Sequence, residues 1–495
     1  MNFFLRQLAL FSILCCCEIC SAAPHLPRVF SDNMVLQREE PVPVWGWADS
    51  GEKVTVAFAG QEKTATADQD GRWKVVLDPL AKSSTPGVLA VRGSGQVLIQ
   101  NVLVGEVWLC SGQSNMEWSV AGSKNAPEEI AKANYPNIRH FKVDHRVAQT
   151  PQTDGPGAWT VCSPLTVRTY TGVGYFFARE ISAKLDVPVG LIHAAWGGTE
   201  AEAWISGAAL EKEAEFKPIL EDFAKKIADY PRAQKEYEEK LGRWTASNKA
   251  GAPPALPIGR ESQHSPAGLF NGMISPLIPF SIRGVLWYQG EANRGRAVAY
   301  RTLFPSLIHD WRRVWDRNDM PFLFVQLANI GPLLAQPKDS NWALLREAQR
   351  MALSVPHTGM AVAIDLGGVE MTHPTNKQDV GLRLALIALG GVYGKDVAYS
   401  SPLYESMSTD GNIIRLKFDK AGLVVKGAKL EGFAIAGTDR RFVWGDAKLV
   451  GETVEVSSPE VAAPVAVRYG WADNPTCNLY SDGGLPASPF RTDDW

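Results

Sequence analysis

Cysteine is scarce in this sequence once the N-terminal segment is set aside. Seven cysteines occur in 495 residues. Four of them belong to the N-terminal segment: Cys15, Cys16, Cys17 and Cys20. The other three are Cys110, Cys162 and Cys477. Three cysteines in so long a chain allow one disulfide at most, so the fold does not depend on a disulfide framework.

The chain also lacks an excess of charge of either sign. Its formal net charge is -3 at pH 7, from 50 basic and 53 acidic side chains. Proteins that bind nucleic acid usually present a basic face, so the composition gives no reason to expect a nucleic-acid partner. After the N-terminal segment, no apolar run is long enough to span a bilayer. We therefore expect no membrane association once a signal peptide is removed.

Motifs for metals and cofactors are missing as well. The sequence has no His-Glu-x-x-His pair, and its one Cys-x-x-Cys, formed by Cys17 and Cys20, lies in the N-terminal segment. It has no phosphate-binding loop and no dinucleotide fingerprint after its first strand. We expect a protein that uses neither a metal nor an organic cofactor.

Residues 1–23 have the pattern of a secretory signal peptide. Arg6 supplies one positive charge, residues 8–17 are apolar, and residues 21–23 are small, as a cleavage site requires. A lipoprotein anchor is the weaker alternative because Leu14 precedes Cys15, where a small residue would be expected. The sequence therefore predicts a secreted or periplasmic protein.

The length predicts two or three domains, and both ends have β character. In residues 24–100 and 398–495, short strand-like runs alternate with turn residues, which predicts β-sandwich-like domains. The first is either a structural support or a carbohydrate-binding module. The composition of the turn-rich tail, residues 478–493, would by itself suggest a frayed terminus.

Residues 101–397 alternate between apolar strand-like runs and helical patterns. This predicts a doubly wound, mainly parallel α/β sheet. The expected strands are 103–109, 187–195, 282–288, 322–327 and 360–365. The expected helices are 173–185, 300–315, 344–355 and 378–392. Ligands of such sheets bind beyond the carboxyl ends of the strands, so chemically active loops are expected there.

A helical insertion interrupts this alternation at about residues 207–264. Apolar side chains recur in it at helical spacing, with charged residues on the other face. This predicts an amphipathic helical hairpin packed on the domain, and a lid over the site is the alternative.

Ser114 follows the first expected α/β strand on a tight corner that contains Gly112. Glycine lets the backbone turn without a Cβ clash, and a helix opening after the corner would direct free N–H groups at a developing negative charge. A serine needs a base to become a nucleophile. His373 is the candidate because it stands in a loop between a strand and a helix, whereas His193 lies inside an apolar strand and is expected to be buried.

Several segments in order resemble the SGNH hydrolases, and most closely the sialate O-acetylesterase family. They are residues 30–37, 112–116, 196–204, 287–293, 373–385 and the tail. The resemblance implies an SGNH-hydrolase-like domain at 101–397 and an ordered tail. It also identifies Ser114 as the nucleophile and His373 as its base.

The same resemblance leaves two carboxylates to orient the imidazole. Glu370 stands three residues before His373, the spacing usual in the superfamily with Glu in place of Asp. Glu291, in the Gln-Gly-Glu block, is the alternative, and either would fix the tautomer and stabilise the imidazolium. The oxyanion hole would combine the N–H groups of Ser114 and Gly198 with the side chain of Gln289.

The resemblance thus implies a serine esterase that removes O-acetyl groups from carbohydrate through an acetyl-enzyme. Sialate is the first substrate to expect, and acetylated xylan or another plant glycan is the alternative. A carbohydrate-binding protein with a degenerate esterase core is an alternative of another class. The sequence gives no indication of oligomeric state.

Overall fold

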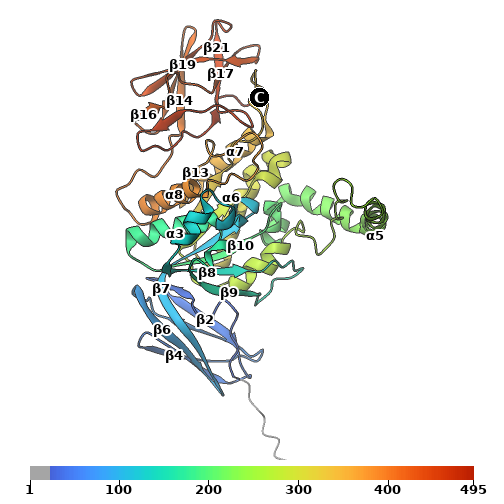
Figure 1. The fold of residues 1–495 in the computed structure, drawn as a ribbon, viewed down its shortest axis with the longest axis vertical. Coiled ribbons are helices and arrows are strands. Elements are labelled where there is room, and N and C mark those ends of the chain that lie inside the picture. The colour runs from blue at the N-terminus through green and yellow to red at the C-terminus, as the bar shows by residue number, and fades with distance from the viewer. Residues whose placement is uncertain (1–22) are drawn as a thin grey trace, which may run out of the picture.

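The computed structural model describes residues 23–495. The predicted signal peptide therefore lies almost wholly outside the described residues. A β-rich region at the N-terminal end, an α/β region in the middle and a second β-rich region at the C-terminal end follow one another along the molecule's long axis (Figure 1).

The centre of the molecule is a parallel sheet in the strand order β13-β12-β11-β7-β10-β8-β9. Its strands are β7 (Gln96–Gly112), β8 (Tyr135–Val143), β9 (Gly157–Cys162), β10 (Val189–Ala195), β11 (Gly284–Tyr288), β12 (Phe322–Gln326) and β13 (Thr358–Val362). All neighbours are parallel except β8 and β9. The predicted parallel α/β sheet is confirmed.

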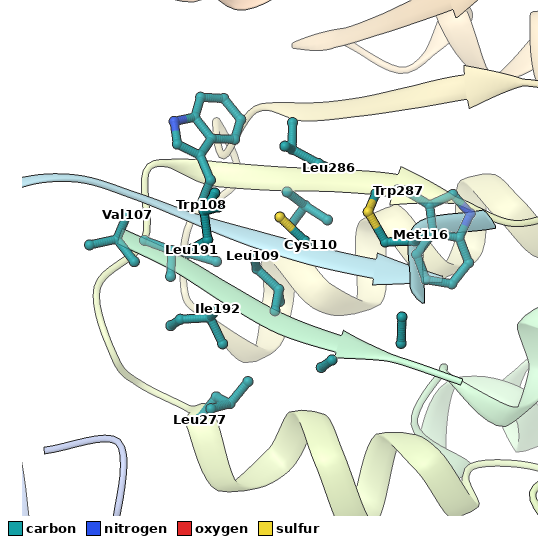
Figure 2. Close-up of a cluster of buried hydrophobic side chains, with 14 of the residues drawn as sticks. Val107, Trp108, Leu109, Cys110, Met116, Leu191, Ile192, Leu277, Leu286 and Trp287 are labelled. Atoms are coloured by element: carbon teal, nitrogen blue, oxygen red, sulfur yellow. The ribbon is translucent and has the colours of Figure 1, made fainter. Parts of the chain in front are cut away.

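The inner strands form because their apolar runs are buried on both faces. Every residue of β10, β11 and β12 is buried, as is β7 from Val102 onward. Side chains alternate between the faces of a strand. Figure 2 shows this in β7, where Trp108 and Cys110 point to one face and Val107 and Leu109 to the other.

Helices cover the sheet as the sequence patterns indicate. They are α1 (Ser114–Glu117), α2 (Ala126–Lys132), α3 (Gly172–Leu185), α4 (Gly207–Lys212), α5 (Lys217–Ala246), α6 (Ala297–Val314), α7 (Asn341–Met351) and α8 (Lys377–Ile387). The four long helices predicted outside the insertion correspond to α3, α6, α7 and α8. The sequence reading missed β8 and β9, because β8 carries the buried polar residues Arg139 and His140 and so shows no apolar run.

The N-terminal region does not end where the sequence predicted. Its strands are β1 (Val35–Gln37), β2 (Val42–Trp47), β3 (Lys53–Phe58), β4 (Gln61–Thr66), β5 (Arg72–Leu77) and β6 (Ser83–Arg92). The predicted boundary at residue 100 falls inside β7, which pairs with β6 and β1 before it enters the central sheet. One continuous hydrophobic core joins this region to the α/β region.

The C-terminal region has a hydrophobic core of its own. Its strands are β14 (Tyr404–Asp410), β15 (Ile413–Phe418), β16 (Leu423–Val425), β17 (Phe433–Gly437), β18 (Phe442–Trp444), β19 (Asp446–Val450), β20 (Thr453–Ser457), β21 (Pro464–Tyr469), β22 (Leu479–Ser481) and β23 (Phe490–Arg491). The tail is ordered, since β23 pairs with β21 and Phe490 is fully buried. Both terminal regions are built of β-sheets, and their packing as sandwiches stays a prediction.

The insertion is a single long helix rather than a hairpin. The short α4 leads into the 30-residue α5, which projects away from the body in Figure 1 and has no fully buried residue. The chain then returns without a second helix through residues 247–264. This return is irregular because it is rich in proline and glycine.

Three further observations concern single features of residues 23–495. No helix in this range is both long and apolar enough to cross a bilayer. The cysteines in it, Cys110, Cys162 and Cys477, are all unpaired. Cys110 is fully buried, and burial raises the pKa of its thiol far above the usual value.

Candidate active site

Ser114 lies at the topological switch point of the central sheet. Strands β8, β9 and β10 lie on one side of β7, and strands β11, β12 and β13 lie on the other. β7 runs between β10 and β11, and Ser114 opens α1 directly beyond its carboxyl end. Gly112 makes this corner possible. Its φ is +132°, and a Cβ there would overlap the carbonyl oxygen of Tyr288. The predicted strand-corner-helix presentation of the serine is therefore present.

His373 reaches Ser114 from the loop between β13 and α8. Its Nε2 lies 2.9 Å from Ser114 Oγ, a hydrogen-bond distance across 259 residues of sequence. The Trp118 ring stacks on the imidazole, with ring centroids 5.0 Å apart and an interplanar angle of 25°. The two side chains named from the sequence thus meet, and an aromatic face fixes the plane of the imidazole.

The environment of His373 favours its neutral form. Burial lowers the pKa of His373, and the nearby positive charge of Lys377 lowers it further. A neutral imidazole can accept the serine proton, so the shift keeps the base available below the ordinary pKa of histidine.

Neither carboxylate proposed to orient the imidazole contacts it. Glu370 is exposed, and among the described residues nothing pairs it with His373. Glu291 is buried, and its Oε1 accepts a hydrogen bond of 2.6 Å from Asn115 Nδ2 instead. Burial raises the pKa of Glu291. The structure thus places Glu291 behind the nucleophile and Glu370 at the surface.

Lys377 and Asn115 complete a buried polar network beside the serine. Lys377 Nζ donates to Asn115 Oδ1 at 2.5 Å and lies 5.3 Å from the centre of the Tyr288 ring. Asn115 Nδ2 also donates to the carbonyl oxygen of Thr372 at 3.1 Å, which ties the nucleophile corner to the loop of His373. Burial lowers the pKa of Lys377 to about 7. Asn115 and Lys377 fall within the sequence segments 112–116 and 373–385, but the sequence indicated no role for either.

The paired glycines after β10 lie against the nucleophile. A Cβ on Gly197 would lie 3.3 Å from the Ser114 Cβ, and Gly198 has a φ of +76° and is exposed. The Gly197 N–H donates to Glu117 Oε2 at 2.7 Å. Among the described residues no acceptor pairs with the N–H of Ser114 or Gly198, and their role in an oxyanion hole stays a prediction.

Gln289 does not fit the predicted role of oxyanion donor. Its side chain is completely buried, and its Nε2 donates to Thr199 O at 3.1 Å and to Asn293 Oδ1 at 2.6 Å. Its Oε1 accepts from the Tyr300 hydroxyl at 2.9 Å. Both amide hydrogens are therefore engaged. Gln289 joins the loop after β11 to the loop after β10, and the prediction for its amide is corrected accordingly.

A histidine–carboxylate pair that does not include His373 borders the site, and the sequence analysis did not predict it. Glu117, in the first helical turn after the nucleophile, lies 2.9 Å from His145 Nε2. The His145 ring stacks on Trp196, with centroids 4.0 Å apart and an interplanar angle of 6°. Burial raises the pKa of Glu117, but the hydrogen bonds from His145 and Gly197 outweigh it, so the pKa lies below its usual value. Glu117 is therefore ionised at neutral pH.

His193, the rejected alternative base, is buried in β10. Burial lowers its pKa to about 3, and among the described residues neither ring nitrogen has a hydrogen-bond partner. The prediction that it is buried is confirmed.

Known proteins resemble the chain over nearly all of its length. A family described as carbohydrate esterase, sialic acid-specific acetylesterase, matches residues 104–249 and 268–389. Sialate O-acetylesterases of Homo sapiens and Pongo abelii are each 30% identical over 514 residues, which cover 93% of this chain and 91% of each relative. A crystal structure of a carbohydrate acetylesterase from Xanthomonas citri is 40% identical, with a TM-score of 0.83 over 95% of this chain and 100% of that chain.

The fold, the serine–histidine pair and these similarities together define a carboxylic ester hydrolase of the carbohydrate esterases. More narrowly, the chain belongs to the sialic acid-specific acetylesterase family.

Proposed function

We propose that this protein is a serine esterase that hydrolyses O-acetyl esters on carbohydrates through an acetyl-enzyme on Ser114. The observation that carries the proposal is the 2.9 Å contact between Ser114 Oγ and His373 Nε2. A contact of this length lets the imidazole take the hydroxyl proton as the oxygen attacks.

In the first half of the reaction, Ser114 Oγ bonds to the acetyl carbon while His373 takes the serine proton. The N–H groups of Ser114 and Gly198 stabilise the negative carbonyl oxygen of the tetrahedral intermediate. The bond from the acetyl carbon to the sugar oxygen then breaks, and His373 gives its proton to the departing sugar hydroxyl.

In the second half, water clears the acetyl group. His373 takes a proton from the water, whose oxygen attacks the acetyl carbon, and the same N–H groups again bind the oxyanion. Collapse of this intermediate returns the proton to Ser114 and releases acetate. The Asn115–Lys377–Glu291 network keeps the nucleophile corner and the His373 loop in register during both halves.

Sialic acid is the proposed carrier of the acetyl group. The family description and the names of the mammalian relatives support this assignment. Rates of acetate release from O-acetyl sialic acid and from acetylated xylan will test it. Faster turnover of O-acetyl sialic acid supports the assignment, and faster turnover of acetylated xylan replaces it.

The catalytic proposal is tested by Ser114→Ala. We expect acetate release to fall by about 10⁴-fold or more, because the remaining groups cannot form the acetyl-enzyme. A fluorophosphonate probe should label Ser114 in the unmodified protein, whereas a purely carbohydrate-binding protein would remain unlabelled. Retained esterase activity in the Ser114→Ala variant would refute the proposal.

Export is proposed from residues 1–23, whose pattern is that of a signal peptide. We expect the mature protein to begin just after Ala23 and to occur in the secreted or periplasmic fraction. N-terminal sequencing of the purified native protein checks this, and a retained Met1 contradicts it.

A further inference from the structure

The return segment of the insertion packs against the glycine loop at the site. Three contacts, from Gln263 and His264 in this segment and from Ala267 just after it, reach residues 197–202, which follow β10. The family match stops at residue 249 and resumes at residue 268, so these contacts come from a part of the chain outside the matched stretches.

Gln263 makes the contact closest to the chemistry. Its Nε2 donates to the carbonyl oxygen of Gly197 at 2.9 Å. The C=O and N–H of a trans peptide point in opposite directions. The bond from Gln263 therefore orients the Gly197–Gly198 peptide so that the Gly198 N–H points away from the return segment.

The preceding peptide is fixed from the other side. Glu117 Oε2 accepts the Gly197 N–H at 2.7 Å, and the site that a Cβ on Gly197 would occupy lies 3.3 Å from both this oxygen and the Ser114 Cβ. Gly197 is therefore held at its N–H by the nucleophile helix and at its C=O by Gln263. Two glycines in sequence have much conformational freedom to lose, so such restraint is needed to keep one orientation.

The return segment is itself anchored, so Gln263 is not a mobile side chain on a free loop. His264 Nδ1 lies 2.8 Å from Glu200 Oε2, and the Ala267 N–H donates to Glu202 O at 2.9 Å. From the opposite side, Gln149 Nε2 donates to Arg260 O at 2.6 Å.

We propose that Gln263 is a positioning residue of the esterase, which holds the Gly197–Gly198 peptide in the orientation that directs the Gly198 N–H at the oxyanion. The inference rests on the proposed function, in which the Gly198 N–H binds this charge. Gln263 contributes through the peptide and touches neither the nucleophile nor its base.

The test is the pair of variants Gln263→Met and Gln263→Glu, neither of which can donate to Gly197 O. Loss of an oxyanion donor costs about 10²–10³ in turnover, so loosening its peptide should lower kcat by about tenfold or more. KM for the acetylated substrate should change little, because the interaction is made in the transition state. Thermal unfolding of both variants shows whether they are folded.

Gln149→Met is the matched control, since it removes a side-chain bond to the same segment that does not reach the glycine peptide. We expect its kcat to stay within about twofold of the unmodified protein, as is usual for an exposed position away from the site. Unchanged kcat in both folded Gln263 variants, or an equal loss in Gln149→Met, overturns the inference.

The outcome for Ser114→Ala separates this inference from the function on which it rests. If Ser114→Ala is inactive and the Gln263 variants are fully active, only the positioning role fails. If Ser114→Ala retains its activity, the proposed function fails first.

Discussion

The base at the site, His373, is set close to a buried positive charge. Its Nε2 faces Ser114, while Lys377 lies four residues further along the chain, at the start of α8, and bonds to Asn115. Burial and this charge both favour the neutral imidazole. The charge next to the base therefore affects the pH range in which the serine can be activated.

Lys377→Met should move the acid limb of the kcat/KM profile to higher pH. The limb follows deprotonation of His373, whose pKa is lowered first by burial and second by the Lys377 charge. Removing the charge leaves burial in place and raises the pKa, so more base is lost in mildly acidic solution. Lys124→Met, which removes an exposed lysine, is the control. An acid limb that stays at the same pH or moves to lower pH would contradict the electrostatic argument.

The two candidate carboxylates should differ in their effect on turnover. Glu370→Gln should keep kcat within about threefold, because the residue is exposed and contacts nothing at the site. Glu291→Met should lower kcat by about tenfold or more, since methionine cannot accept the hydrogen bond that holds Asn115, and a buried donor left without a partner costs about 1–3 kcal/mol. Steady-state kinetics of both variants measure this difference in kcat. A larger loss in Glu370→Gln would restore it as the orienting residue.

Residue patterns predicted the reactive pair but not its surroundings. Ser114 and His373 stand on loops that follow strands, where local composition shows a corner and a topological rule brings loop ends together. The hydrogen-bond partners of Asn115 are residues 291, 372 and 377, and no local sequence pattern predicts contacts between residues so far apart in the chain. The prediction for Gln289 was wrong for the same reason, because its side-chain amide forms hydrogen bonds with Thr199, Asn293 and Tyr300.

Among the elements, β7 links the N-terminal strands to the site through a buried ion cluster. Arg38 Nε lies 2.5 Å from Glu106 Oε1, and Arg283 Nε lies 2.8 Å from Glu106 Oε2. The Glu106 side chain is completely buried, whereas the other carboxylates that pair with these two arginines, Glu39 and Glu40, are more exposed.

Glu106→Ala should therefore lower the free energy of unfolding by about 3–5 kcal/mol, the usual cost of removing one partner from a buried ion pair. Urea denaturation measures the change. Glu39→Ala is the control, because Glu39 pairs with the same Arg38 at the surface, where loss costs about 0–1 kcal/mol. Equal losses for the two variants would mean that burial adds nothing to the cluster.

Elements were predictable where burial is uniform. Strands β10, β11 and β12 are buried throughout and were therefore visible as apolar runs. Strand β8 was not predicted, because it contains buried polar side chains. The domain boundary at residue 100 was predicted from a change in composition, but β7 continues across this position without a break. The insertion was found by its helical period, but a period cannot tell one long helix from two short ones.

At the scale of the whole molecule, Arg346 connects the α/β region to the C-terminal region. Its buried guanidinium donates to the carbonyl oxygens of Leu327, Ala328, Ala472 and Asp473 at 2.7–2.9 Å. Burial lowers its pKa to about 10, so it remains charged at neutral pH. The two hydrophobic cores are separate, which makes this polar connection important for keeping the regions together.

Arg346→Met should destabilise the junction by about 3–5 kcal/mol, because four buried carbonyl oxygens lose their charged donor. Limited proteolysis should then cut the C-terminal region faster than in the unmodified protein, and Arg441→Met, at an exposed arginine, should not. Unchanged cleavage would show that the remaining contacts, among them the Arg491–Glu347 ion pair, are enough to hold the two regions together.

The unbroken course of β7 has a consequence for any attempt to recombine this chain with its relatives. One strand of 17 residues begins beside the N-terminal sheet and ends two residues before the nucleophile. The N-terminal region therefore cannot be exchanged as a separate domain. Chimeras will keep the reactive hydroxyl in place only if the whole of Gln96–Gly112 is inherited from a single parent.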